Sequence, residues 1–118
     1  MLVIQNNSED IIATILSYAH PDLKLPPWNL AVKYLRSVPP KTKDYNYNLS
    51  LSRTWKNEIM GNSKDTLLIF FVSQDTLRKY GYDSIGYANI VKDDKIIGCK
   101  FITNKDLGSG GNGLVFFS

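Results

Sequence analysis

An unbroken alternation of apolar and polar residues runs from Tyr45 to Ser52. Because successive side chains of a β-strand point to opposite faces, the tyrosines and leucines of this stretch fall on one face. Its asparagines and serines then fall on the other face. A helix would scatter the same residues around its circumference. The pattern therefore predicts a strand with one buried face and one solvated face, and it places Tyr45 and Tyr47 with the core leucines.

Other apolar runs also predict strands. The run Thr66–Val72 is continuously apolar, which favours a central strand buried on both faces. Residues 84–91 and 96–103 are strand-like segments joined by a short polar connection, which predicts a β-hairpin. Shorter strands are expected at residues 2–5 and 114–117. Strands therefore dominate the second half of the predicted order.

Helical spacing predicts three helices. Residues 7–19 begin with polar capping residues and then carry apolar side chains that share one side of a helix. The stretch 28–38, bracketed by proline pairs, is expected to be a well-buried helix with a narrow basic stripe facing out. Residues 73–81 combine a serine cap with a terminal glycine, which is typical of a short helix. Residues 54–60 fit a short helix or a loop equally well.

Early helices and late strands favour an α+β fold, with the N-terminal helices packed on one face of a mainly antiparallel sheet of four to six strands. A length of 118 residues predicts one domain, 1–118. No apolar run approaches the roughly 20 residues that span a bilayer, and the N-terminus does not resemble a signal peptide. Cys99, the single cysteine, is expected to be a small buried hydrophobic residue. These features predict a cytoplasmic location and no membrane partner.

Positive charge gathers in the middle of the chain, although the whole chain carries a net charge of only +3. Residues 24–64 contain eight basic residues and two acidic ones, whereas residues 1–22 contain three acids and no Lys or Arg. A basic region of this kind attracts anionic partners, although it can equally be a solvated face. The eight basic residues are Lys24, Lys33, Arg36, Lys41, Lys43, Arg53, Lys56 and Lys64.

Signatures of common catalytic classes are absent from the sequence. It contains no Gly-x-Ser-x-Gly elbow, no His-Glu-x-x-His motif, no Walker loop and no dinucleotide fingerprint. The glycine-rich stretch Gly108–Gly113 runs into a predicted strand and not a helix, so it is interpreted as a turn and not as a phosphate loop. Neither a cofactor nor a bound metal is expected. His20, the single histidine, is interpreted first as an exposed residue at the end of a helix.

The first functional hypothesis is therefore a small protein-binding protein. We expect an inhibitor of the immunity or antitoxin type, which neutralises a toxin or an enzyme by direct binding. Motif-free α+β proteins fit this class, since binding surfaces carry little sequence signature. The partner is expected to present an acidic surface, and the oligomeric state stays open. The residues expected to bind it are Lys33, Arg36, Lys41, Lys43, Asn46, Asn48, Arg53, Trp55 and Lys56.

The second hypothesis is a nucleic-acid-binding protein or a small metal-independent ribonuclease that uses residues 24–64. Lys and Arg supply phosphate contacts, and exposed aromatic side chains can stack on bases. Catalysis would then rest on His20, Arg53 and Lys56, with the cations stabilising developing phosphorane charge. A domain with no separable activity is the third alternative.

Overall fold

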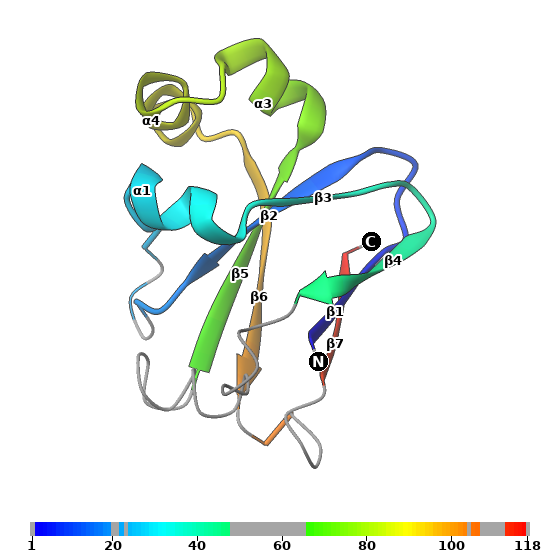
Figure 1. Ribbon diagram of the computed structural model, residues 1–118. Coiled ribbons are helices and arrows are strands. Elements are labelled where there is room, and N and C mark those ends of the chain that lie inside the picture. The colour runs from blue at the N-terminus through cyan, green and yellow to red at the C-terminus, as the bar shows by residue number, and fades with distance from the viewer. Residues whose placement is uncertain are drawn as a thin grey trace.

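The computed structural model describes residues 2–19, 22, 24–47, 66–103, 105–106 and 113–117. Within these ranges the chain forms two β-sheets and a group of short helices (Figure 1). The strands are β1 (Leu2–Asn6), β2 (Ile12–Ser17), β3 (Arg36–Val38), β4 (Thr42–Tyr47), β5 (Thr66–Ser73), β6 (Ile96–Thr103) and β7 (Gly113–Phe117). The helices are α1 (Trp28–Ala31), the 3-10 turn η1 (Val32–Tyr34), α3 (Gln74–Tyr80) and α4 (Ser84–Lys92).

The two sheets differ in size and in strand direction. The smaller sheet has the order β4-β1-β7, in which β1 pairs antiparallel with β4 and parallel with β7. The larger sheet has the order β3-β2-β5-β6 and is antiparallel throughout. Figure 1 shows the helices on the side of the larger sheet that faces away from β1, β4 and β7. The described chain is therefore built in three layers, with the larger sheet in the middle.

Strand β5 is buried on both faces, as its continuous apolar sequence predicts. Leu67, Ile69 and Phe71 enter a core between the two sheets, called here the inter-sheet core. The residues between them enter a second core, between the larger sheet and the helices, called the helix-side core. The inter-sheet core consists of Leu2, Ile4, Ile12, Leu16, Val38, Leu67, Ile69, Phe71, Ile102 and Val115. The helix-side core consists of Ala13, Ile15, Ala31, Leu68, Phe70, Val72, Leu77, Tyr87 and Ile90.

The helix predicted for residues 7–19 is wrong, because Ile12–Ser17 forms strand β2. All six of its side chains are buried, and the apolar ones divide between the two cores: Ile12 and Leu16 enter the inter-sheet core, and Ala13 and Ile15 enter the helix-side core. A strand that is apolar on both faces also places apolar residues at helical spacings, so periodicity does not separate the two structures. Pairing with β3 on one side and β5 on the other decides for the strand.

The predicted helix at residues 28–38 is much shorter than expected. Helix α1 ends at Ala31, and the 3-10 turn η1 that follows it ends at Tyr34. Strand β3 then pairs with β2, which places Val38 opposite Ile12. Because residues 12–17 were predicted to be helical, the sequence did not indicate a strand edge with which residues 36–38 could pair. Leu30 and Val32, expected to be buried, are 54% and 45% exposed.

Residues 84–91 are also wrongly predicted, since they belong to helix α4. Asp83 caps this helix, and its Oδ1 accepts a hydrogen bond of 2.7 Å from the backbone N–H of Gly86. The buried residues Gly86, Tyr87 and Ile90 follow helical spacing along one face. The predicted hairpin is therefore a helix–strand connection into β6.

Several other predicted elements are confirmed. Strand β1, helix α3 with its Ser73 N-cap, strand β6 and strand β7 lie where the patterns place them. Strand β4 starts at Thr42, within the predicted polar connector, and is described as far as Tyr47. Residues 48–52 and 54–60 lie outside the described residues. The fold is mixed α and β, but its helices mostly follow strands, and two sheets replace the single one expected.

Strand β2 carries a buried polar side chain whose contribution to stability can be tested directly. Thr14 on β2 is fully buried opposite Phe71, and within the described chain its Oγ1 has no hydrogen-bond partner. We expect Thr14→Val to raise the free energy of unfolding by about 1 kcal/mol, since a buried unsatisfied hydroxyl costs roughly that much. Urea denaturation measures the change.

Ser17 provides the matched control for this substitution. It is also buried on β2, but its Oγ donates to the Lys24 carbonyl at 2.7 Å. Ser17→Ala is therefore expected to destabilise the protein by about 1 kcal/mol. Equal shifts of the same sign in both variants would contradict the assignment of Thr14 as unsatisfied.

Candidate functional site

An apolar groove lies beside the start of α1 and the end of β2. It has a volume of about 400 Å³. Its walls come from the end of β2, from the extended residues 24–27 and from α1 and η1. Within the described chain its lining contains two lysines and no acidic residue. This α1 groove is lined by Leu16, Ser17, Tyr18, Ala19, Lys24, Leu25, Pro26, Pro27, Leu30 and Lys33.

The extended wall of the α1 groove is fixed to the core by its backbone carbonyls. The Lys24 carbonyl accepts the Ser17 hydroxyl at 2.7 Å, and the Pro26 carbonyl accepts the Tyr87 hydroxyl at 2.5 Å. Burial raises the pKa of Tyr87 to about 12, so its hydroxyl stays protonated and continues to donate near neutral pH. The Tyr87 ring also lies against Trp28, with 5.5 Å between ring centroids. The Ser17 and Tyr87 side chains therefore hold this wall in position through its carbonyl groups.

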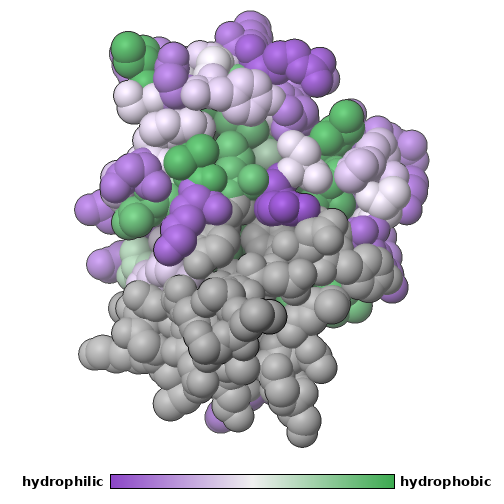
Figure 2. Space-filling model, viewed as in Figure 1, coloured by the Kyte–Doolittle hydropathy of each residue, from purple (hydrophilic) through white to green (hydrophobic). Residues whose placement is uncertain are grey.

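The outer wall of the groove is hydrophobic where solvent reaches it. The backbone N–H groups of Leu30 and Ala31 both donate to the Pro27 carbonyl, at 3.0 and 2.9 Å, which starts α1 directly after the proline pair. The first turn thereby turns Leu30 outward. Figure 2 shows hydrophobic and hydrophilic residues interleaved where α1 and η1 lie. Apolar surface with polar residues around it is the arrangement found at protein interfaces.

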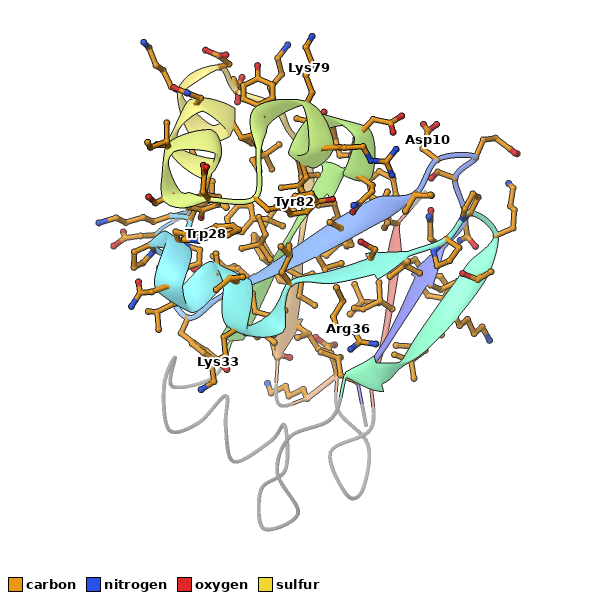
Figure 3. The ribbon with its side chains drawn as sticks, turned by 45° about the horizontal axis from the view of Figure 1, so that its top comes forward. Asp10, Trp28, Lys33, Arg36, Lys79 and Tyr82 are labelled. Atoms are coloured by element: carbon orange, nitrogen blue, oxygen red, sulfur yellow. The ribbon has the colours of Figure 1, made fainter. Side chains whose placement is uncertain are left out.

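Four of the predicted binding residues follow the chain from η1 through β3 into β4. We call Lys33, Arg36, Lys41 and Lys43 the basic strip. Lys33, Lys41 and Lys43 are exposed, and Arg36 is half-buried. Figure 3 shows Lys33 and Arg36 toward the same side of the molecule and Arg36 between β3 and β4, well away from Lys79 on α3. Lys33 belongs both to the basic strip and to the α1 groove.

Lys41 has a structural role within this strip. Its Nζ donates to the Asn7 carbonyl at 2.7 Å and lies 3.2 Å from Glu9 Oε1. The ion pair is largely exposed and therefore contributes little to stability. These contacts join the β3–β4 turn to the β1–β2 connection. Lys41 is thus a weaker candidate for partner binding than the sequence alone indicates.

Of the remaining predicted site residues, only one belongs to the described chain. Asn46 belongs to β4. Five others lie outside the described residues, so the ribonuclease arrangement stays a prediction. These five are His20, Asn48, Arg53, Trp55 and Lys56.

The sequence interpretation missed the α1 groove. Its signal was present in Leu25 followed by a proline pair, because two prolines fix an extended backbone next to a helix start. Only the tertiary structure shows that Leu30 turns away from the core, since that depends on which face of α1 covers the larger sheet. Lys24, which is not among the predicted binding residues, likewise lines the groove.

A second hollow, of about 360 Å³, lies between the edge strands β6 and β7. Exposed Phe101, Leu114 and Phe116 contribute to it, together with Lys100 and Asp106. The Asp106 carboxylate accepts the Thr103 backbone N–H at 2.8 Å, which lowers the pKa of Asp106. This carboxylate is engaged in closing the turn after β6, which makes the hollow a weaker candidate than the α1 groove.

The described part of the chain offers little for metal or thiol chemistry. Cys99 on β6 is a half-buried free cysteine packed against the helix-side core, and burial raises its thiol pKa. This disfavours the reactive thiolate. Among the described residues no three His, Cys, Asp or Glu side chains group around a common point. No helix in the same ranges is long and apolar enough to cross a membrane.

The chain was compared with protein-family models, with curated proteins and with solved structures, and none of the three comparisons yields a match.

Proposed function

We propose that this chain is a small protein-binding protein of the immunity or antitoxin type, which inhibits a toxin or enzyme through the α1 groove and the basic strip. The observation that supports this most is that Lys33, one of the four basic residues along η1, β3, the β3–β4 turn and β4, also lines the apolar α1 groove. Protein interfaces combine an apolar centre with a charged rim, and the charges select partners of opposite sign. The partner therefore presents an acidic surface around an apolar centre. A single cysteine fits action in the reducing cytoplasm.

The first experiment identifies the partner. A tagged full-length chain is purified from the cells that naturally encode it, and the bound material is quantified. The proposal expects one protein in stoichiometric amount, whose activity falls when the purified chain is added back. Recovery of RNA in place of a protein, with affinity that falls steeply as salt rises, would support the nucleic-acid alternative. RNA cleavage lost in His20→Ala, Arg53→Ala and Lys56→Ala would establish the ribonuclease.

Charge reversal on the basic strip tests the surface itself. We expect Lys33→Glu combined with Lys43→Glu to weaken partner binding by at least about tenfold, mainly by slowing association, because rim charges steer encounter. Stopped-flow or surface plasmon resonance measures both rate constants.

The matched control is Lys79→Glu combined with Lys95→Glu, which makes the same charge change on exposed residues of α3 and of the α4–β6 connection. This control should leave the affinity within about twofold. Equal losses in both double variants would show that net charge alone governs binding and would remove the basic strip from the interface.

A further inference from the structure

The α1 groove has features of a preformed anchor site. We propose that it holds a large apolar side chain presented by an acidic segment of the protein partner, with carboxylates of that segment meeting Lys24 and Lys33. The proposal rests on the proposed function and names the part of the partner that the groove recognises.

The wall of the groove is in position before any partner binds. Buried Ser17 and Tyr87 hold the carbonyls of Lys24 and Pro26, and the Pro27 carbonyl starts α1. Proline also restricts the backbone φ angle, so two consecutive prolines leave this wall few alternative conformations. Binding then orders little additional chain, and preorganisation of this kind favours affinity.

The chemistry of the lining defines the occupant. Leu25 and Pro26 are half-buried, whereas Pro27 and Leu30 are exposed, so the groove offers apolar surface that solvent reaches. A buried aromatic or aliphatic anchor is the usual centre of a protein interface. Lys24 and Lys33 contribute the only charges among the described lining residues, and both are positive. Carboxylates that flank the anchor therefore match the rim, whereas basic flanks are repelled.

Synthetic peptides test this specificity on the full-length chain. The probe is an acetylated, amidated peptide of sequence Asp-Glu-Leu-Trp-Glu-Asp. One comparison peptide replaces every acid by Lys, and another replaces Leu-Trp by Ser-Gly. In an NMR titration we expect the probe to shift resonances of Leu25, Leu30 and Ala19 saturably, with a dissociation constant on the order of 1 mM or below. Neither comparison peptide should saturate these shifts.

Leu30→Asp provides the decisive variant, because it removes apolar wall and places a carboxylate beside the acidic peptide. We expect at least about tenfold weaker peptide binding. Leu30 is 54% exposed, so the variant should fold, and its thermal unfolding is checked alongside. Phe116→Asp makes the same kind of change at an exposed residue of β7, in the other sheet, and should bind the peptide normally.

Three results would overturn the groove assignment: saturable shifts that map elsewhere, equal binding of the Ser-Gly peptide, or unchanged binding by Leu30→Asp. The natural partner separates this assignment from the proposed function. If the Lys33/Lys43 double variant loses the partner while Leu30→Asp keeps it, the inhibitor function stands and the anchor site is wrong. If the cells yield no protein partner, the inhibitor function itself is wrong.

Discussion

Gly86→Ala is expected to destabilise the protein by at least about 3 kcal/mol, a large part of the stability of a small domain. A Cβ atom at Gly86 would lie 2.3 Å from the Gly81 carbonyl oxygen and 2.4 Å from that of Tyr80. Both contacts are with backbone at the end of α3, so the clash is relieved only by moving α3 away from α4. Thermal and urea unfolding measure the loss.

Gly98→Ala is the control for this prediction. Its Cβ would lie 3.4 Å from the Phe117 ring and 3.6 Å from the Phe71 ring, which are ordinary contacts with side chains. We expect a change within about 1 kcal/mol, because β6 gains a residue with less backbone freedom at little steric cost. A Gly86→Ala variant as stable as Gly98→Ala would show that the α3–α4 contact is loose enough to admit a methyl group at Gly86.

The second large effect is expected at Asn6, which is fully buried at the end of β1. Its Nδ2 donates to the carbonyls of Asp10 at 2.7 Å and Val38 at 2.9 Å. Its Oδ1 accepts two hydrogen bonds from Ser8, one from the backbone N–H at 2.9 Å and one from the side-chain hydroxyl at 2.7 Å. One side chain thus fixes both the β1–β2 connection and the end of β3.

Asn6→Asp keeps the shape of this side chain but replaces its donor by an acceptor that faces three carbonyls, those of Asp10, Val38 and Pro39. We expect a loss of at least about 3 kcal/mol near neutral pH, because a buried charge would be left without a donor there. The folded state would raise the pKa of this new carboxyl, since only the protonated form can donate. The deficit should therefore shrink as pH falls from about 7 to about 4, which urea denaturation at both values measures.

Asn7→Asp is the matched control. The Oδ1 of Asn7 accepts the Gln5 side-chain amide at 2.7 Å, and an aspartate can do the same. We expect less than about 1 kcal/mol of change and no comparable recovery in acid. If both aspartate variants lose stability equally, the role assigned to the Asn6 amide is wrong.

The candidate site was only partly predictable from sequence. The basic character of residues 33–43 follows directly from composition, and the structure arranges these cations along η1, β3 and β4. The exposure of Leu30 could not be predicted from composition, because it depends on α1 ending after one turn and on η1 leading into β3. The helical segment ends at Tyr34 because residues 36–38 pair with the edge of β2 as strand β3.

Local chemistry determined several elements by itself. Helix α3 has a serine at its N-cap position, an acid in its first turn and a glycine just past its end, so the local sequence favours a helix, although the Ser73 side chain makes no capping hydrogen bond. Strand β5 could be recognised because the six consecutive apolar residues Leu67–Val72, between polar segments, need burial on both faces. The alternating pattern also predicted the part of β4 from Tyr45 to Tyr47. The side chains of these residues are not among those described, so the burial of the two tyrosines stays a prediction.

Tertiary structure decided β2 and β3, and α4 depends both on its local Asp83 cap and on its packing against α3. Ile12–Ser17 is apolar at spacings that suit a helix or a doubly buried strand, and only its pairing with β5 selects the strand. Residues 84–91 could alternate as a strand, but Asp83 caps a helix whose Gly86 fits against the end of α3. Local sequence therefore determined the elements whose start and end signals fit only one structure, such as α3 and β5. Elements whose pattern fits two structures were decided by the neighbours that bury them, because burial and backbone pairing outweigh intrinsic propensity.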